Sequence, residues 1–172
     1  VNVAKNEGFK TVITIRGVGY ETNQNAIATP SVSYHLDGIY VASPYSLQTD
    51  FLDLERIEVL RGPQGTLFGQ NSTGGAINVI TQAPTTEAAF GSADLTLGDH
   101  GLTKLRAIIN RPLNENLAMR ASFISNKRDG FTDNLTNGQD LDDADSVSAR
   151  VRFRYEPSED FRANFTAQVF DE

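Results

Sequence analysis

The sequence ERIEVLRGPQGTLFG occupies residues 55–69, and GGAINVIT follows it at residues 74–81. This stretch predicts two short strands around a compact loop, because Ile and Val, which favour strands, gather at its two ends. Between them, Gly62-Pro63 indicates a turn, since proline cannot donate a hydrogen bond to a neighbouring strand. Gly74 and Gly75 allow positive φ angles before the second strand. The pattern predicts a local shape and, taken by itself, no function.

The charge and composition of the chain exclude several classes of protein. Its 172 residues include 15 basic and 22 acidic side chains, a formal net charge of −7, whereas a nucleic-acid-binding surface would be basic. It contains no cysteine, which excludes a disulfide framework and a cysteine-based metal or redox site. No apolar run approaches the roughly 18 residues of a transmembrane helix, and no signal peptide is recognisable. Because the chain starts on Val1 and stops at Glu172 directly after a strand pattern, we expect a fragment with both ends missing.

The first 81 residues predict a small α+β domain with short strands and many glycines. A β-branched strand pattern covers residues 10–16, and a second one at residues 31–41 is interrupted by Asp37-Gly38, a hairpin-turn signal. Residues 82–87 (QAPTTE) have the composition of a linker.

Beyond this linker apolar and polar residues alternate strictly, which predicts five consecutive antiparallel strands. In the clearest of them, valine, alanine and aromatic side chains alternate with Arg150, Arg152 and Arg154. Strands of about ten residues are long enough to cross a bilayer at a tilt. The alternating segments are residues 92–97, 104–110, 117–124, 146–155 and 161–169.

Two environments produce such an alternation. In a soluble β-sandwich or lipocalin-like barrel the apolar face points inward, whereas in an outer-membrane barrel it meets lipid and the polar face lines a wet lumen. Residues 112–116 and 156–160 predict short turns on one side, and residues 128–145 predict a long acidic loop on the other, as in outer-membrane barrels. The connection at residues 99–101 is short although it lies on the side of the long loop, so the difference in loop length depends on residues 128–145 alone. The alternation by itself is compatible with both environments.

Three groups of residues resemble the plug domain of TonB-dependent outer-membrane receptors of the iron-complex type. They are TIRG at residues 14–17, DGIYV at residues 37–41, and the stretch from Leu54 to Thr81 with IEVLRGP, GTLFG and GGAIN in the family's order. The resemblance implies a mainly β protein with a partial α+β plug domain over residues 1–86. Residues 87–172 would then be the first five or so antiparallel strands of a transmembrane barrel of about 22 strands.

The resemblance also implies a transporter in the bacterial outer membrane rather than an enzyme. Such receptors bind a scarce nutrient, most often a ferric siderophore or another iron complex and otherwise haem, cobalamin or carbohydrates. The TonB complex, on the periplasmic side, remodels the plug with energy from the proton gradient. We therefore expect TonB, an iron complex and outer-membrane lipid as partners, with no nucleic acid and no cofactor. A soluble β-rich ligand-binding module is the alternative.

The resemblance assigns roles to several plug residues. Arg16 and Arg61 match plug arginines that face acidic residues of the barrel wall, and with Glu58 we expect them to lock the plug through charge-assisted hydrogen bonds. Ordinary surface ion pairs are the alternative. A backbone role, rather than ligand contact, is expected of the remaining motif residues, which are Gly17, Asp37, Gly38, Gly62, Pro63, Gly65, Gly69, Gly74 and Gly75.

Other candidate sites carry weaker signals. In the barrel interpretation Arg150, Arg152 and Arg154 face the lumen. The acidic segment at residues 140–145 could bind calcium, but it lacks the spacing and central glycine of an EF-hand, so we expect a solvated loop. The two histidines stand alone, and neither a metal site nor a catalytic set is predicted.

The predicted role of Arg61 can be tested in the full-length receptor. We expect Arg61→Ala to reduce both transport and the stability of the plug, because it removes a charge-assisted hydrogen-bond donor worth about 2 kcal/mol. Ligand uptake by cells and thermal unfolding of the purified receptor measure the two effects. Wild-type transport together with wild-type plug stability would contradict the role.

Overall fold

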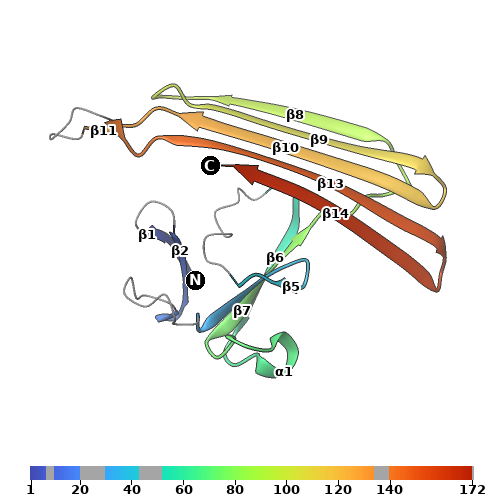
Figure 1. The fold of residues 1–172 in the computed structure, drawn as a ribbon, viewed down its shortest axis with the longest axis horizontal. Coiled ribbons are helices and arrows are strands. Elements are labelled where there is room, and N and C mark those ends of the chain that lie inside the picture. The colour runs from blue at the N-terminus through green and yellow to red at the C-terminus, as the bar shows by residue number, and fades with distance from the viewer. Residues whose placement is uncertain (7–9, 20–29, 43–51, 134–139, 172) are drawn as a thin grey trace. The chain divides into compact units, whose positions relative to one another are not determined.

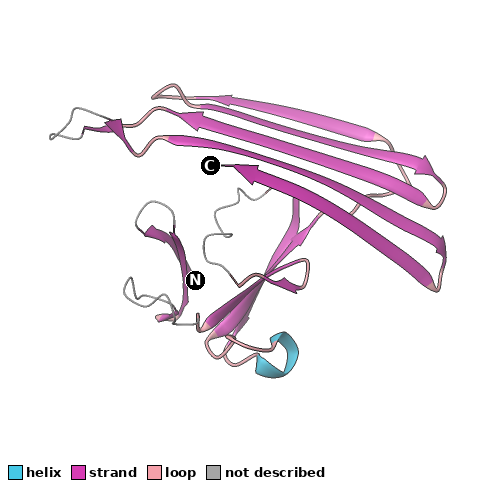
Figure 2. Ribbon diagram, viewed as in Figure 1, coloured by secondary structure: helices cyan, strands magenta, loops and turns pink. Residues whose placement is uncertain are grey.

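The computed structural model describes residues 1–6, 10–19, 30–42, 52–133 and 140–171, which form two compact units (Figure 1). Residues 1–49 and 54–81 make up the first unit, and residues 50–53 and 82–172 make up the second. Strands dominate both units (Figure 2), so the predicted mainly β fold is confirmed. The short segment that ends at Asp53 therefore groups with the long strands, although it lies among first-unit residues in the sequence.

The first unit contains two small sheets. In the first sheet β2 lies between β1 and β3, and all pairs are antiparallel. The second sheet has the order β5-β4-β7-β6, in which β4 runs parallel to β7 and β6 runs antiparallel to it. The strands are β1 (Asn2–Asn6), β2 (Lys10–Ile15), β3 (Val18–Gly19), β4 (Val32–Leu36), β5 (Ile39–Tyr40), β6 (Leu54–Arg61) and β7 (Gly75–Thr81).

The two strands predicted around the glycine-rich loop are β6 and β7. The loop between them contains α1 (Gly65–Phe68), the one helix in the described ranges and far too short to span a membrane. A small core of Ile15, Val32, Ile77 and Val79 stabilises the unit from β2, β4 and β7. Burial of these β-branched side chains explains why β7 is covered along almost its whole length.

The predicted hairpin turn at Asp37-Gly38 joins β4 to β5 and is confirmed. Asp37 and Gly38 have φ angles of 50° and 80°, the conformation that a tight two-residue turn requires. The Asp37 carboxylate also accepts hydrogen bonds from the Thr81 amide at 2.8 Å and the Thr81 hydroxyl at 2.7 Å. The turn is thereby tied to the end of β7.

The second unit contains a five-stranded antiparallel sheet with the order β14-β13-β10-β9-β8, coloured green to red in Figure 1. Each long strand pairs with the next long strand along the chain, as in an up-and-down barrel wall. A small hairpin, β11 (Thr132–Asp133) with β12 (Asp140–Leu141), interrupts the sequence between β10 and β13. The long strands are β8 (Phe90–Leu97), β9 (Thr103–Asn114), β10 (Leu117–Arg128), β13 (Ala144–Ser158) and β14 (Phe161–Asp171).

The strands run further than the alternation predicted. The short turn predicted at residues 112–116 is present, but its predicted bounds are too wide, because β9 continues through Pro112 and only Glu115 and Asn116 turn. Pairing between β8 and β9 ends at Asn110, so Pro112 has a neighbour on one side only and its missing N–H costs little. The turn predicted at residues 156–160 shortens in the same way, since β13 extends to Ser158.

The two faces of this sheet have opposite polarity. Polar side chains such as Arg120, Ser122 and Arg150 are at most 7% exposed, whereas Phe165 and Val169 are 62% and 69% exposed. A soluble sandwich buries its apolar face, and this sheet does the reverse. Of the two environments that the alternation left open, the lipid-facing barrel wall is the one that matches.

The exposed apolar face makes a prediction about the chain produced alone. We expect it to associate in plain buffer and to become dispersed in detergent, because β8 and β14 are edge strands and the apolar side chains lack a lipid-like solvent. Light scattering on the same preparation with and without detergent measures this. A monodisperse monomer in plain buffer would contradict the assignment of the apolar face to lipid.

Candidate functional site

The polar face of β10 carries a buried ion pair with Asp53. The Arg120 guanidinium donates from Nε and Nη2 to the two carboxylate oxygens of Asp53, both at 2.6 Å. Ser122 adds a third hydrogen bond at 2.8 Å from its hydroxyl to Asp53 Oδ2. The two charged side chains are only 8% and 5% exposed. Bidentate, charge-assisted pairs of this kind are among the strongest polar contacts in proteins.

Further arginines hold the backbone on either side of this pair. Arg150 Nη1 donates to the carbonyl of Leu52 at 2.8 Å, and Arg152 Nη1 donates to the carbonyl of Gln82 at 3.2 Å. The backbone amide of Gln82 in turn donates to the backbone carbonyl of Asp53 at 3.0 Å. Two chain segments that lie almost 30 residues apart in the sequence are thus bound side by side on one face of β10 and β13. We call the contacts of Leu52, Asp53 and Gln82 with these strands the arginine clamp.

The backbone at Asp53 is held in a conformation that it would not adopt freely. Its φ angle is 56°, in the left-handed region, which costs a non-glycine residue about 1 kcal/mol. Leu52, next to it, is completely buried. Backbone strain at a buried site persists only where the surroundings enforce it. We therefore infer that the contacts of the clamp hold the backbone of Asp53 in this conformation.

The environment also fixes the charge of Asp53. Burial alone would raise its pKa, but hydrogen bonds from Arg120 and Ser122, with the charges of Arg120 and Arg150, hold the pKa below the ordinary value of 3.8. A carboxyl group with a lowered pKa contributes stability that is complete above its ordinary pKa and is lost as the pH falls through the lowered one. The ion pair is therefore intact at neutral pH.

Asn110 on β9 holds the linker that precedes β8. Its side-chain oxygen accepts from the Thr85 amide at 3.0 Å, and its amide group donates to the carbonyls of Thr85 at 2.9 Å and Ala88 at 2.8 Å. Only 1% of Asn110 is exposed, so an unbonded side chain there would be costly. Asn110 lies opposite Arg120 in the sheet register, which makes the two contacts part of one polar face.

The predicted lock charges do not come together in the described part of the chain. Glu58 accepts from Arg56 Nε at 2.7 Å and Asn78 Nδ2 at 3.0 Å, which lowers its pKa. Arg16 and Arg61 are exposed, and no hydrogen bond or ion pair joins either of them to Glu58 among the described residues. Their role at the barrel wall stays a prediction.

The motif glycines are placed where backbone geometry restricts the choice of residue. A Cβ atom on Gly75, whose φ is 144°, would lie 2.4 Å from the Leu60 carbonyl oxygen, and one on Gly74 would lie 2.7 Å from the Val18 side chain. These two positions admit no larger residue without movement of β6 or β3. Pro63 and Gly65 lie in the β6–α1 turn and at the start of α1. The positive-φ glycines of the motifs are Gly17, Gly38, Gly62, Gly69 and Gly75.

Arg150, Arg152 and Arg154, predicted to face the lumen, lie on the same face as the clamp. The first two contact the segments that contain Leu52 and Gln82, and Arg154 pairs with Glu156 at 2.7 Å. All three arginine side chains therefore already have partners within the chain. Their assignment to a lumen stays a prediction.

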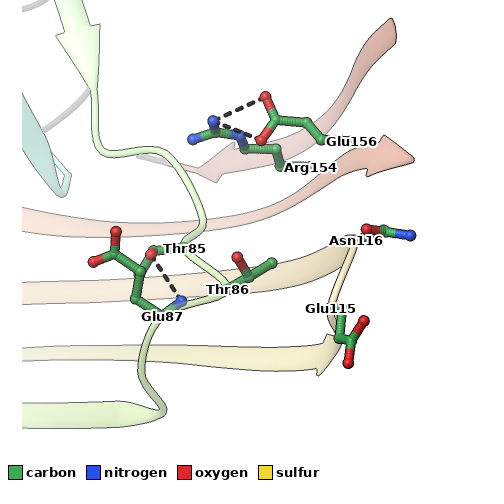
Figure 3. A pocket seen from close by; sticks show the side chains of 7 residues that line it. All are labelled: Thr85, Thr86, Glu87, Glu115, Asn116, Arg154 and Glu156. Atoms are coloured by element: carbon green, nitrogen blue, oxygen red, sulfur yellow. Dashed lines mark hydrogen bonds and ion pairs between the residues drawn. The ribbon is translucent and has the colours of Figure 1, made fainter. Parts of the chain in front are cut away.

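A polar cavity of about 280 Å³ lies near the short turns of the second unit (Figure 3). Arg154 is its one cationic side chain, and Figure 3 shows that residue already paired with Glu156. Arg162 also donates to Glu156. The lining residues are Thr85, Thr86, Glu87, Glu115, Asn116, Arg154 and Glu156. We assign no ligand to this cavity.

The remaining candidates have structural surroundings. His35 is buried against the rings of Phe68, 4.8 Å away, and Tyr40, 5.6 Å away, and burial lowers its pKa. In the acidic segment the Asp142 carboxylate accepts from the Thr132 hydroxyl at 2.6 Å. Among the described residues no group of three or more His, Asp or Glu side chains could hold a metal ion.

The first unit resembles a known protein family. Residues 1–76 match the model of the TonB-dependent Receptor Plug Domain. The first unit belongs to the plug domains of TonB-dependent receptors. The family confirms the predicted location in the outer membrane and the predicted succession of plug and barrel strands.

Curated relatives of this receptor chain include siderophore receptors. It is 38% identical to the pesticin receptor of Yersinia enterocolitica over 74 residues, which are 43% of this chain and 10% of that protein. It is 30% identical to the ferric enterobactin receptor PirA of Pseudomonas aeruginosa over 107 residues, 59% of this chain and 14% of that protein. The matched stretch thus spans a small part of each relative.

Solved structures extend the likeness over nearly the whole chain. The ferric yersiniabactin uptake receptor FyuA from Yersinia pestis superposes with a TM-score of 0.83 at 26% identity, covering 98% of this chain and 27% of that one. The copper transporter OprC superposes with a TM-score of 0.75 at 18% identity, covering 99% of this chain and 26% of that one, and shares the fold. The long strands of the second unit therefore share the fold of the matched strands in these structures.

The arginine clamp was not among the sites predicted from the sequence. One signal was available, since Asp53 is an acidic residue within the apolar sequence FLDL, where a carboxylate needs a partner. Nothing in the sequence indicates that the partner is Arg120, which lies 67 residues further along the chain.

Removing the buried carboxylate should loosen the clamp. In the full-length receptor we expect Asp53→Asn to destabilise the segment around residue 53 by about 3 kcal/mol, because Arg120 is left buried without its counter-charge. Hydrogen exchange of peptides from this segment should become about a hundredfold faster at neutral pH.

The matched control is Ser122→Ala, which removes one hydrogen bond and should cost about 1 kcal/mol. The difference between wild type and Asp53→Asn should shrink as the pH falls through the lowered pKa of Asp53, since the wild-type carboxyl group is then protonated too. Equal exchange in wild type and Asp53→Asn at neutral pH would show that the ion pair does not stabilise the segment.

Proposed function

We propose that this chain is part of a receptor that takes up a ferric siderophore, or another iron complex, across the bacterial outer membrane with energy supplied through TonB. The plug-domain match over residues 1–76 is the observation that carries the proposal, because a plug is needed only where a wide barrel must be closed until transport. The names of relatives support the iron complex. They include the ferric enterobactin receptor PirA and the ferric yersiniabactin uptake receptor FyuA.

We also propose the division of labour between the two parts of the chain. Residues 1–86 would form the later part of the plug, and residues 87–172 would form the first strands of the barrel wall. The separation of the described chain into two units, with a change from short to long strands after Thr81, supports this division. The lock charges Arg16, Glu58 and Arg61 and the lumen-facing Arg150, Arg152 and Arg154 belong to the same proposal.

The polarity of the long strands supports a membrane role over a soluble binding module. A soluble module would bury residues such as Leu97, Phe165 and Val169, which are between 62% and 69% exposed. Their exposure would cost about 2 kcal/mol each in water, whereas lipid accepts them without penalty.

Cargo and energy source are tested together in the native bacterium. We expect deletion of the full-length gene to abolish uptake of at least one ferric siderophore under iron starvation, because such complexes are too scarce and too large for passive entry. Uptake of a panel of ferric catecholate, phenolate and hydroxamate complexes, with haem and cobalamin alongside, is measured in cells with and without the gene. The plasmid-borne gene should restore uptake, and deletion of TonB should remove it again.

Two results would speak against the proposal. Unchanged uptake of every ferric complex in the deletion strain, with loss of haem or cobalamin uptake, would assign another cargo. Uptake that depends on the gene but survives loss of TonB would overturn the energy source.

A further inference from the structure

Residue Asp53 lies where the chain enters the β6–β7 hairpin, and Gln82 lies where the chain leaves it. We infer that Asp53, bound by Arg120 and Ser122, is a positioning residue that anchors the base of this hairpin to the barrel strands and keeps it anchored throughout transport. The inference rests on the proposed function, because it concerns what stays fixed while the plug is remodelled. Asp53 and Arg120 are not among the residues expected to lock the plug. In this pair the acid precedes β6 in the chain and the base lies on β10.

The contacts of the carboxylate leave little freedom for a second arrangement. Asp53 Oδ1 accepts from Arg120 Nη2, and Oδ2 accepts from both Arg120 Nε and Ser122 Oγ, at distances of 2.6 to 2.8 Å. Both donor residues lie on one face of β10, two positions apart. The flanking Leu52 carbonyl is bound to Arg150 on β13, so the segment is attached to two neighbouring strands.

The charges of the strand face favour an acid next to Arg120. The sheet register places Arg120 directly opposite Arg152, and like charges in opposed positions repel each other. Arg150 lies opposite Ser122 in the same register and adds a third positive charge nearby. The charges of Arg120 and Arg150 both act on the Asp53 carboxylate, which supplies a negative charge beside them.

The position of the clamp in the sequence explains why it would remain closed. A pulling force applied upstream of Leu52 travels along the backbone and reaches the clamp before it reaches β6. The hydrogen bond from the Gln82 amide to the Asp53 carbonyl joins entry and exit of the hairpin at this point. The strand hydrogen bonds between β6 and β7 are thus protected from a force that the clamp can carry, and remodelling is confined to residues that precede it.

The test uses a disulfide in place of the ion pair, in the full-length receptor. Asp53→Cys with Ser122→Cys places a redox-controlled link at the clamp, in a region of the receptor that contains no other cysteine. We expect the reduced double variant to leak, so that cells become permeable to a large antibiotic that the closed receptor excludes. We also expect uptake of the ferric complex to fall. We expect oxidation to restore both the barrier and the uptake, because a clamp that stays closed can be covalent.

The matched control is Ala121→Cys with Val151→Cys, a directly opposed pair on β10 and β13 whose oxidation should change neither readout. Loss of uptake on oxidation of the clamp pair, with recovery on reduction, would overturn the inference, since the clamp would then have to open. A reduced clamp variant with the barrier and uptake of wild type would also overturn it.

A second set of variants decides the matter if the disulfide does not form. Asp53→Arg should open the barrier, and adding Arg120→Asp should close it again by restoring one pair of opposite charges. Failure of Asp53→Arg to change permeability would contradict the anchor. Permeability needs neither a known cargo nor TonB, so a receptor that imports no iron complex but leaks when Asp53 is replaced would refute the proposed function and leave the anchor intact.

Discussion

The buried ion pair between Asp53 and Arg120 is the contact on which the polar face of the strand unit depends. Several arginines and a buried asparagine share this face, and each would be costly to bury without a partner. Asp53 neutralises part of the charge, and Ser122 adds a hydrogen bond to its carboxylate. The backbone carbonyls of Leu52 and Gln82 accept from Arg150 and Arg152. The segments at Leu52–Asp53 and Gln82 thus supply partners for the buried arginines of this face.

The opposite face follows from the same constraint. A strand has two sides, so a sheet that directs its charged side chains toward buried chain segments must direct its apolar side chains outward. In water this arrangement would be unfavourable, and it becomes favourable only beside lipid. The inverted polarity is therefore a physical reason for the outer-membrane location that is independent of the plug motifs.

Much of the fold could be predicted because it rests on local patterns. Two-residue alternation predicted the five long strands, and the glycines and Asp37-Gly38 predicted the turns of the first unit. The strand ends were predicted less well, since whether β9 may pass through Pro112 depends on where its neighbour β8 stops. The partners in the clamp could not be predicted, because the apolar surroundings of Asp53 indicate only that it needs a partner and Arg120 lies 67 positions further along the chain.

The sequence by itself determined the class of protein, since the motif at residues 55–81 and the alternation that follows it need only short-range order to be recognised. Only the tertiary structure decided which charges are paired. An ionic contact is specified by the meeting of two faces, and that meeting depends on strand register and on the route of the intervening chain rather than on any local pattern. Glu58 and Arg61 stood out in the motif, whereas the ion pair that is buried among the described residues joins Asp53 to Arg120.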